Sequence, residues 1–495
     1  MFGWRDKMNY VIALDEGTTS TRAVLYNLET QKIERIKSMQ INQIYPKPSY
    51  VEQSALEIYS SSLAALVEVI DSVGADKVLG IGITNQRETV IAWEKNSGKP
   101  LYNAIIWQCR RTADYCKQVE KQYGELIKSK TGLKVDPYFS ASKMRWLLDN
   151  SPEVQRALSE NNLCFGTVET YLVYRLTGGK SFVTDYTNAS RTMLFNIDTL
   201  CWDKDLLQIF GIPESALPKV VSPDQIVGEF EYQGKAIKIA GLAGDQQSAM
   251  VGQGCFERGS AKITYGTGLF MLANLGNNRK NSEKGLVTTL GYGKTPAYMF
   301  EGSVFNAGSA VQWLRDELDF FEKSETSEKL AVSVPDSNGV YVVPAFTGLG
   351  APYWVSEATG LITGITRGVN KAHITRAVLE SMAYSAKDLC DVMISEGGIT
   401  LSEIRVDGGA SKNNFLMQFQ SDILNIAVDR PVERESTALG AVYLCEIALG
   451  LKTIEQICES RKSEQRFLPS AERQKYNRLY SGWLEAVKRC IYDKK

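Results

Sequence analysis

Residues 10–26 of the chain are YVIALDEGTTSTRAVLY. An apolar run ends in Asp15, a turn rich in Gly and Thr follows, and a second apolar run begins at Ala23. Short apolar runs separated by small turn residues predict a β-hairpin. The N–H groups and hydroxyls of such a turn suit phosphate oxygens, and an acid at the end of the strand suits a hydrated Mg²⁺ ion. An ordinary polar hairpin has the same pattern, so this motif alone does not decide the function.

A similar pattern recurs about half a chain later, where residues 261–272 are AKITYGTGLFML. Two hairpins of this kind predict two α/β lobes of similar construction, which we expect to comprise residues 1–255 and 256–495. Amphipathic stretches at 55–73 and 374–394 predict helices, and apolar runs at 78–83 and 404–406 predict strands. We expect the active site in the cleft between the lobes.

The composition of the 495 residues indicates a globular protein, with 44% hydrophobic and 23% charged residues. The 56 Lys and Arg nearly balance the 57 Asp and Glu, so the chain lacks the positive surplus typical of nucleic-acid binders, and small molecules are the expected partners. No apolar run approaches the roughly 18 residues that span a bilayer, and the first residues lack the features of a secretory signal. The nine cysteines are scattered without a CxxC pair, which predicts reduced thiols in a cytoplasmic enzyme without membrane insertion.

The single histidine, His373, narrows the chemistry. One histidine leaves no basis for a His-rich metal site and disfavours Ser-His-Asp or Cys-His catalysis. Proton transfer therefore falls to carboxylates, Lys or Tyr.

A third glycine-containing segment adds to the two hairpin turns that suit phosphate oxygens. Residues 404–414 are IRVDGGASKNN, followed by a predicted helix at 415–424. Glycines at a strand-to-helix turn let the backbone approach a nucleotide closely, and the Asn413 amide is placed to meet it. Neither GxxxxGK[ST] nor GxGxxG occurs in the chain, which disfavours Walker-type and Rossmann-type nucleotide binding.

Two polar clusters are candidates for substrate binding: TNQRET at 84–89 and AGDQQ at 243–247. The Arg87-Glu88 pair offers a donor fork beside an acceptor, the complement of a polyol's hydroxyls, although such a pair also occurs as a plain surface ion pair. Asp245 lies at the start of a predicted helix at 246–252, where an Asp more often serves as the N-cap. If Asp245 faces the substrate instead, its carboxylate accepts the proton of a hydroxyl that attacks the γ-phosphate of a nucleotide.

Longer stretches carry a resemblance to a known family. Residues 138–150 (YFSASKMRWLLDN) and residues 360–380 are similar to its two signatures, and ITNQRET, NAIIWQCRRTA, TNASRTMLFNI, AGDQQ, YGTG and RVDGGASKNN match it further. From residue 10 to about residue 450 the chain resembles the FGGY family of carbohydrate kinases, and within it the members that phosphorylate glycerol. The chain departs from the usual pattern at Glu16, where many relatives have Gln, and at Ser140-Ala141-Ser142-Lys143, where Ser-Gly-Thr-Lys is more usual.

The resemblance implies an α/β fold of the actin, hexokinase and heat-shock chaperone ATPase type, related to ribonuclease H, with a βββαβαβα core in each lobe. It implies the ATP-dependent formation of sn-glycerol 3-phosphate in glycerol catabolism, with Mg²⁺ as the metal, and a homo-oligomer of two or four chains. His373 belongs to the second signature and is expected at the start of a helix.

The resemblance also implies roles for individual residues. Asp245 is the implied general base, and Asp15 and Asp245 are the implied metal-binding residues. The residues implied to bind glycerol are Arg87, Glu88, Trp107, Tyr138, Asp245, Gln246 and Phe270. The residues implied to contact ATP are Thr18, Thr19, Ser20, Arg22, Thr267, Gly308, Gln312, Gly409 and Asn413.

Three alternatives remain open at this point. In the first, the acceptor is another short polyol or a ketose. In the second, the chain is an actin-like or chaperone-like ATPase that phosphorylates no metabolite. In the third, the chain is a regulatory protein that binds a polyol without catalysis. The ATPase alternative gives no reason for the ITNQRET and AGDQQ clusters. The presence of Asp15, Asp245 and Thr267 argues against the regulatory protein without catalysis.

Overall fold

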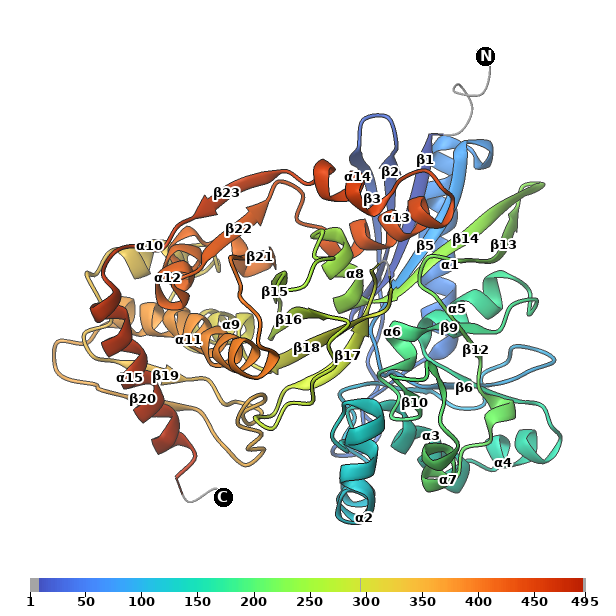
Figure 1. The fold of residues 1–495 in the computed structure, drawn as a ribbon, viewed down its shortest axis with the longest axis horizontal. Coiled ribbons are helices and arrows are strands. Elements are labelled where there is room, and N and C mark those ends of the chain that lie inside the picture. Colours follow the sequence, from blue (N-terminus) through green and yellow to red (C-terminus); the bar gives the residue numbers. More distant parts are fainter. Residues whose placement is uncertain (1–8, 294, 493–495) are drawn as a thin grey trace. The chain divides into compact units, whose positions relative to one another are not determined.

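The computed structural model describes residues 9–293 and 295–492, which form two compact units (Figure 1). Unit 1 comprises Met1–Gly254, Thr289–Pro296 and Ser436–Glu459, and unit 2 comprises Cys255–Thr288, Ala297–Glu435 and Ser460–Lys495. The lobes expected at 1–255 and 256–495, and the cleft between them, stay predictions. The N-terminal segment searched for a secretory signal lies largely outside the described residues.

Unit 1 is built on a six-stranded sheet with the order β13-β14-β5-β1-β2-β3. The antiparallel part consists of β1 (Tyr10–Glu16), β2 (Ser20–Asn27) and β3 (Lys32–Gln40). Two strands, β5 (Val78–Asn85) and β14 (Lys235–Gly244), extend the sheet parallel to β1, and β13 (Ile226–Tyr232) pairs antiparallel at the edge. β1 and β5 are buried along nearly their whole lengths, as apolar strands covered on both faces are.

Helices of unit 1 cover this sheet. The structure has α1 at Ala55–Val73, the range predicted from the periodicity, and the side chain of Ser54 caps it by accepting a hydrogen bond from Glu57 N. α1 buries Ile58, Leu66 and Ile70 against the sheet, because these apolar residues share one helical face. The other helices before residue 254 are α2 (Ala113–Thr131), α3 (Ser140–Asn150), α4 (Pro152–Ser159), α5 (Val168–Leu176), α6 (Tyr186–Ala189), α7 (Lys204–Phe210) and α8 (Asp245–Gly252).

Short strands form small two-stranded sheets beside the main ones. Their pairings in unit 1 are β4 (Glu52–Gln53) with β7 (Ala104–Ile105), β6 (Ile91–Glu94) with β8 (Leu163–Gly166), β9 (Val183–Asp185) with β12 (Lys219–Val221), and β10 (Phe195–Asn196) with β11 (Cys201–Trp202). In unit 2, β19 (Tyr341–Val343) pairs with β20 (Leu361–Thr363).

Unit 2 repeats the strand arrangement of unit 1. Its seven-stranded sheet has the order β17-β18-β16-β15-β21-β22-β23. The strands are β15 (Ala261–Tyr265), β16 (Leu269–Gly276), β17 (Val287–Gly291), β18 (Ala297–Val304), β21 (Glu403–Gly408), β22 (Ala427–Pro431) and β23 (Ser463–Phe467). β15, β16 and β18 pair antiparallel, while β21 and β22 follow parallel to β15. This is the order of β1, β2, β3, β5 and β14, so the prediction of two similarly built α/β halves is confirmed.

The helices of unit 2 are α9 (Gly308–Asp316), α10 (Thr326–Val332), α11 (Lys371–Gly397), α12 (Asn414–Leu424) and α15 (Arg473–Cys490). His373 lies in the first turn of α11, as predicted. It forms a capping box with Asn370, whose backbone N–H donates to His373 Nδ1 (3.2 Å). The histidine therefore stabilises the start of a long helix.

Helix α13 (Ser436–Ala448) follows β22 in sequence but belongs to unit 1, as does most of α14 (Ile454–Ser460). α13 packs against α8 and against β14, β1 and β5. Glycines make this approach possible: a Cβ added to Gly82 would lie 2.2 Å from Ala441 O, and one added to Gly440 would lie 1.8 Å from Ser248 O. Unit 1 is thus completed by a segment nearly 200 residues after α8.

We expect the Gly440→Ala variant to lose about 1–3 kcal/mol of unfolding free energy, because its methyl group would overlap the backbone of α8. The displacement of α8 should also lower activity, since Asp245 is the first residue of that helix. Thermal and denaturant unfolding measure the first effect, and steady-state kinetics the second.

Gly124→Ala in α2 is the matched control. The three atoms nearest to its added Cβ all belong to the end of the Glu120 side chain, at 2.8 Å from Cδ, and none is backbone. Alanine is the better helix former, so this variant should be as stable as wild type or up to about 1 kcal/mol more stable. Equal stability of the two variants would contradict the close packing of α8 and α13.

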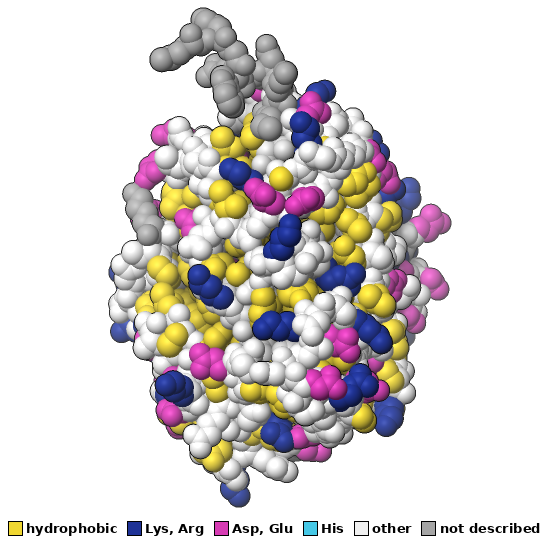
Figure 2. Space-filling view, turned by 90° about the vertical axis from the view of Figure 1, so that its right-hand side faces the viewer, with side chains coloured by type: hydrophobic (Ala, Val, Ile, Leu, Met, Phe, Trp, Pro, Cys, Tyr) yellow, Lys and Arg dark blue, Asp and Glu magenta, His cyan; other side chains and the backbone are white. Residues whose placement is uncertain are grey.

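The surface and the helices carry few unusual features. On the face drawn in Figure 2, Lys and Arg side chains are scattered, with Asp and Glu among them, in keeping with a net charge of -1. All nine cysteines are free thiols. Among residues 9–293 and 295–492, no helix has both the length and the apolarity needed to cross a membrane.

Candidate active site

The carboxyl ends of three parallel strands meet in register in unit 1. Glu16 of β1 lies opposite Asn85 of β5, and Asn85 lies opposite Gly244 of β14. The residues that follow these strand ends therefore gather at one edge of the sheet, the edge at which open α/β sheets bind ligands. The two polar clusters singled out in the sequence, at 84–89 and 243–247, both lie there.

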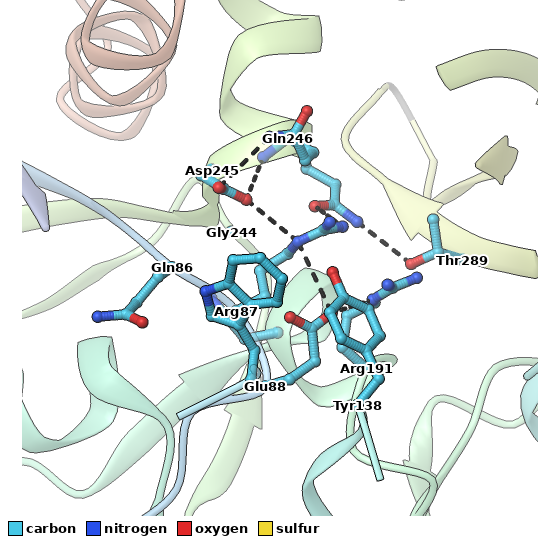
Figure 3. Close-up of polar contacts among 12 residues, drawn as sticks. Gln86, Arg87, Glu88, Tyr138, Arg191, Gly244, Asp245, Gln246 and Thr289 are labelled. Atoms are coloured by element: carbon cyan, nitrogen blue, oxygen red, sulfur yellow. Dashed lines mark hydrogen bonds and ion pairs between the residues drawn. The ribbon is translucent and has the colours of Figure 1, made fainter. Parts of the chain in front are cut away.

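Arg87 is the centre of this group (Figure 3). Its guanidinium Nε lies 3.1 Å from Asp245 Oδ1 and 3.9 Å from Glu88 Oε1. Nη1 donates to Gln247 Oε1 (3.2 Å), and Gln247 Nε2 donates in turn to Thr289 Oγ1 (3.2 Å). The Arg87-Glu88 pair is almost fully buried, with both side chains 2% exposed, so the alternative of a plain surface ion pair is wrong.

Arg191 joins the group from the segment after α6, and sequence reasoning missed it. Its Nε donates to Glu88 Oε1 (2.6 Å), and its guanidinium carbon lies 5.6 Å from the centre of the Tyr138 ring. Both side chains of the Arg191-Glu88 pair are nearly inaccessible to solvent. The TNASR stretch belongs to the pattern that carries the family resemblance, but nothing within it signals a partner 103 residues away.

Asp245 is the first residue of α8, and Gly244 is the N-cap. The structure therefore does not use Asp245 as the N-cap, the more common role for an Asp near a helix start. Asp245 Oδ1 accepts a hydrogen bond from Gln246 N (2.7 Å), while Gly244 N donates to Thr187 Oγ1 (2.9 Å). The Asp245 side chain is 33% exposed, so its carboxylate is open to a ligand.

The first hairpin turn is shorter than the sequence suggested. β1 continues through Asp15 and Glu16, and β2 begins at Ser20, so the turn comprises only residues 17–19. Asp15 forms an ion pair with Arg22 on the neighbouring strand.

The hairpin turn is also joined to an aromatic residue that the resemblance assigns to glycerol. Trp107 Nε1 donates to Thr18 Oγ1 (2.9 Å), and the Trp107 ring meets the Tyr138 ring edge-on at 5.7 Å between centroids. The turn that the resemblance assigns to ATP and the Trp107 side chain that it assigns to glycerol are thus in direct contact within unit 1.

Glu16 is a buried acid beside this turn. Burial raises the pKa of Glu16 well above its usual range, the side-chain hydrogen bond from Gln86 opposes this, and the charges of Asp15 and Asp245 raise it further. Gln86 Nε2 lies 3.3 Å from both Glu16 carboxylate oxygens. The two implied metal-binding acids therefore both act electrostatically on one buried group.

The remaining candidate residues belong to unit 2. Thr267 O accepts from Ala307 N (2.9 Å) and Ser309 N (3.1 Å), which ties the β15–β16 turn to the start of α9, the helix of Gly308 and Gln312. Tyr265 lies opposite Gly408, so Gly409 follows the strand next to this turn. Asn413 is the N-cap of α12, where its Oδ1 accepts from Leu416 N (2.9 Å). Phe270 lies in β16.

No cluster of three or more His, Cys, Asp or Glu side chains is arranged to hold a metal ion within the described part of the chain. Asp15 and Asp245 are each paired with a guanidinium, of Arg22 and Arg87. A Mg²⁺ ion needs only one or two protein carboxylates, because waters and phosphate oxygens complete its coordination. The donors present fit Mg²⁺ in this role.

Comparison with known proteins identifies the family. The model of the FGGY N-terminal domain matches residues 10–252, and that of the C-terminal domain matches residues 261–449. The chain belongs to the FGGY family of carbohydrate kinases. The C-terminal match includes α13, the helix that packs in unit 1.

Curated relatives and solved structures agree with this family. Glycerol kinase of Symbiobacterium thermophilum is 50% identical, covering 97% of this chain and 98% of its own, and that of Bacillus subtilis is 50% identical, covering 97% and 99%. The crystal structure of Plasmodium falciparum glycerol kinase with ADP superposes with a TM-score of 0.92 at 36% identity, covering 98% of each chain. A ligand-bound xylulose kinase from Lactobacillus acidophilus, with a TM-score of 0.88 at 23% identity and 98% coverage of each chain, shows the shared fold. The expected kinase fold is thereby confirmed, and the family's chemistry implies ATP as the phosphoryl donor.

Proposed function

We propose that this protein phosphorylates glycerol, transferring the γ-phosphoryl group of ATP to a terminal hydroxyl to form sn-glycerol 3-phosphate. The observation that carries the proposal is the buried group of Arg87, Glu88 and Arg191 beside Tyr138, with the partly exposed Asp245 carboxylate paired to Arg87. Curated relatives 50% identical over nearly the whole chain are named glycerol kinase, which supports the same acceptor.

The charges of this group suit an uncharged acceptor. Two guanidiniums face two carboxylates, so the group is close to neutral overall. A sugar acid would bring an uncompensated negative charge, whereas a polyol needs only donors and acceptors for its hydroxyls. We assign hydroxyl binding to Arg87, Glu88, Tyr138, Asp245 and Gln246, and contact with the carbon backbone to Trp107 and Phe270.

Asp245 is the proposed general base. Its carboxylate accepts the proton of the attacking hydroxyl, while Arg87, at 3.1 Å, holds that carboxylate in position. Phosphoryl transfer otherwise requires positioning and charge stabilisation rather than covalent catalysis, so no histidine is needed.

The nucleotide contacts are proposed for both units. In unit 1 these are Thr18, Thr19, Ser20 and Arg22, and in unit 2 they are Thr267, Gly308, Gln312, Gly409 and Asn413. Mg²⁺ would be held near Asp15 and Asp245, largely through water, and would neutralise charge on the phosphates. The cytoplasmic location and the homo-oligomeric state stay predictions.

The decisive experiment measures coupled ADP release with ATP and Mg²⁺, with and without glycerol. We expect strong stimulation by glycerol, and phosphorus NMR of the product should show a phosphate monoester on a terminal carbon. A panel of other short polyols and ketoses tests the nearest alternative. Equal or better turnover with another acceptor would overturn glycerol as the substrate, and ADP release that no acceptor stimulates would favour the ATPase alternative.

A further inference from the structure

Lys143 of α3 is a lysine with no solvent-exposed surface. Its ammonium donates to the carbonyl oxygens of Tyr138 (2.5 Å) and Phe139 (3.1 Å), just before and at the start of α3. It also donates to the carbonyl oxygen of Glu88 (3.2 Å), which comes from the segment after β5. A protonated lysine has three N–H groups and no acceptor, so these three carbonyls match its full donor capacity.

The backbone at Glu88 needs such support. Glu88 has φ 63°, in the left-handed region that residues other than glycine, asparagine and aspartate rarely enter. Such a conformation persists only where the surrounding structure holds it. Here Ser140 Oγ also donates to the Glu88 carbonyl oxygen (3.2 Å), so two donors from the first turn of α3 hold the peptide that follows Glu88.

The conformation of Glu88 decides where its carboxylate lies. From this position Glu88 Oε1 meets Arg191 Nε at 2.6 Å and Arg87 Nε at 3.9 Å. The same ammonium that holds the Glu88 carbonyl holds the Tyr138 carbonyl. Lys143 therefore joins the backbones of two residues whose side chains we assign to the acceptor.

We propose that Lys143 is a positioning residue for acceptor binding: it sets the Glu88 and Tyr138 backbones relative to each other without touching the acceptor itself. This inference rests on the proposed function. It gives a role to a residue of the 138–150 signature that none of the substrate contacts above uses.

The protonation state of Lys143 provides a second line of support. Burial lowers the pKa of Lys143 to about 8, and Glu88, Cys109, Cys116 and Asp136, the titratable groups that face it, partly oppose this shift. A neutral amine has only two N–H groups, so deprotonation leaves one of the three carbonyls without its donor. Acceptor binding should therefore weaken as the pH rises through this range.

The first test is the Lys143→Met variant, which keeps the length of the side chain and removes its donors. At about pH 7 we expect the KM for glycerol to rise about tenfold or more, because a buried carbonyl loses its donor. We expect kcat and the KM for ATP to stay close to wild type, since Lys143 contacts neither Asp245 nor the nucleotide-binding turns. A glycerol KM like that of wild type, or a fall in kcat without a change in KM, would overturn the proposal.

The second test is the pH profile of the glycerol KM. We expect the wild-type KM to rise between about pH 7 and about pH 9, and the KM of Lys143→Met to be nearly independent of pH there. The matched control is Lys134→Met: burial also lowers the pKa of Lys134 to about 8, and of its charged neighbours Asp136, Arg110 and Glu120 only Asp136 also faces Lys143. This control should keep the wild-type profile, and a profile flattened equally in both variants would contradict the assignment to Lys143.

A third variant, Ser140→Ala, guards against misfolding of Lys143→Met. It removes the other donor to the Glu88 carbonyl without changing charge, and we expect a smaller rise in the glycerol KM. If Lys143→Met does not fold, an unchanged KM in Ser140→Ala together with a flat wild-type profile overturns the proposal. The wild-type assay separates the two claims: no stimulation by glycerol refutes the proposed function, whereas stimulation that is equal in all variants refutes only the role of Lys143.

Discussion

The Asp245→Asn variant is expected to lose about a hundredfold to ten-thousandfold in kcat for glycerol phosphorylation, the usual contribution of a positioned general base. Asparagine keeps the size of the side chain and the oxygen that accepts from Gln246 N (2.7 Å), but an amide cannot take up the proton of the attacking hydroxyl. Binding of glycerol and ATP should change much less than kcat. Steady-state kinetics and calorimetric titration of each ligand measure the two effects separately.

A second aspartate of unit 1 provides the matched control. Asp205 also lies in the first turn of a helix, α7, and its carboxylate pairs with Lys130 Nζ at 2.6 Å. Because Asp205 is exposed and its carboxylate pairs with Lys130 rather than with a residue of the Arg87 group, Asp205→Asn should retain wild-type kcat. If Asp245→Asn keeps more than about a tenth of the wild-type kcat, Asp245 is not the base.

Replacing Arg191 by methionine should lower the unfolding free energy by up to about 3–5 kcal/mol, because the buried Glu88 carboxylate loses the nearer guanidinium and keeps the longer ion pair with Arg87. Glu88 is the charge in question: its side chain is 2% exposed, and Arg191 Nε is its nearest cation at 2.6 Å, compared with 3.9 Å for Arg87. Denaturant unfolding of the wild type and the variant measures the loss. The glycerol KM should rise as well, because the Glu88 carboxylate loses the contact that orients it.

The Glu88→Gln change tests whether the buried charge of Glu88 is the cause of this loss. In the double variant with Arg191→Met no carboxylate remains at position 88, so we expect the double variant to be more stable than Arg191→Met alone. A loss in the double variant that is smaller than the sum of the losses in the two single variants is the signature of a direct charge pair. Strictly additive losses of stability would show that Arg191 stabilises the fold through other contacts.

Much of the framework could be predicted from local sequence. The apolar residues of α1 repeat at helical spacing behind the Ser54 cap, and the predicted range 55–73 is the observed one. The two hairpins were predictable because apolar strand residues and small turn residues alternate within about a dozen positions. The end of β1 was not: Asp15 and Glu16 have the polar character of turn residues, but they pair with Arg22 and Thr21 on β2 and with Thr84 and Asn85 on β5.

The candidate site was predictable in part. Arg87-Glu88 and Asp245-Gln246 could be selected because their adjacent donors and acceptors suit a polyol. Arg191 and Lys143 could not, because nothing in their own segments distinguishes a buried cation from an exposed one. Their roles follow from contacts with Glu88, 103 and 55 residues away in sequence.

Local sequence therefore specifies the two hairpins, the main helices and the chemical character of the polar clusters, since periodicity, caps and turn residues act over a few positions. Long-range packing specifies the rest. It brings α13 onto α8 through glycine contacts, it buries Arg191 and Lys143 around Glu88, and it leaves the carboxylate of Asp245 open to a ligand. The physical reason is that the cost of burying a charge, or of bringing two backbones together, depends on groups that only the folded chain places side by side.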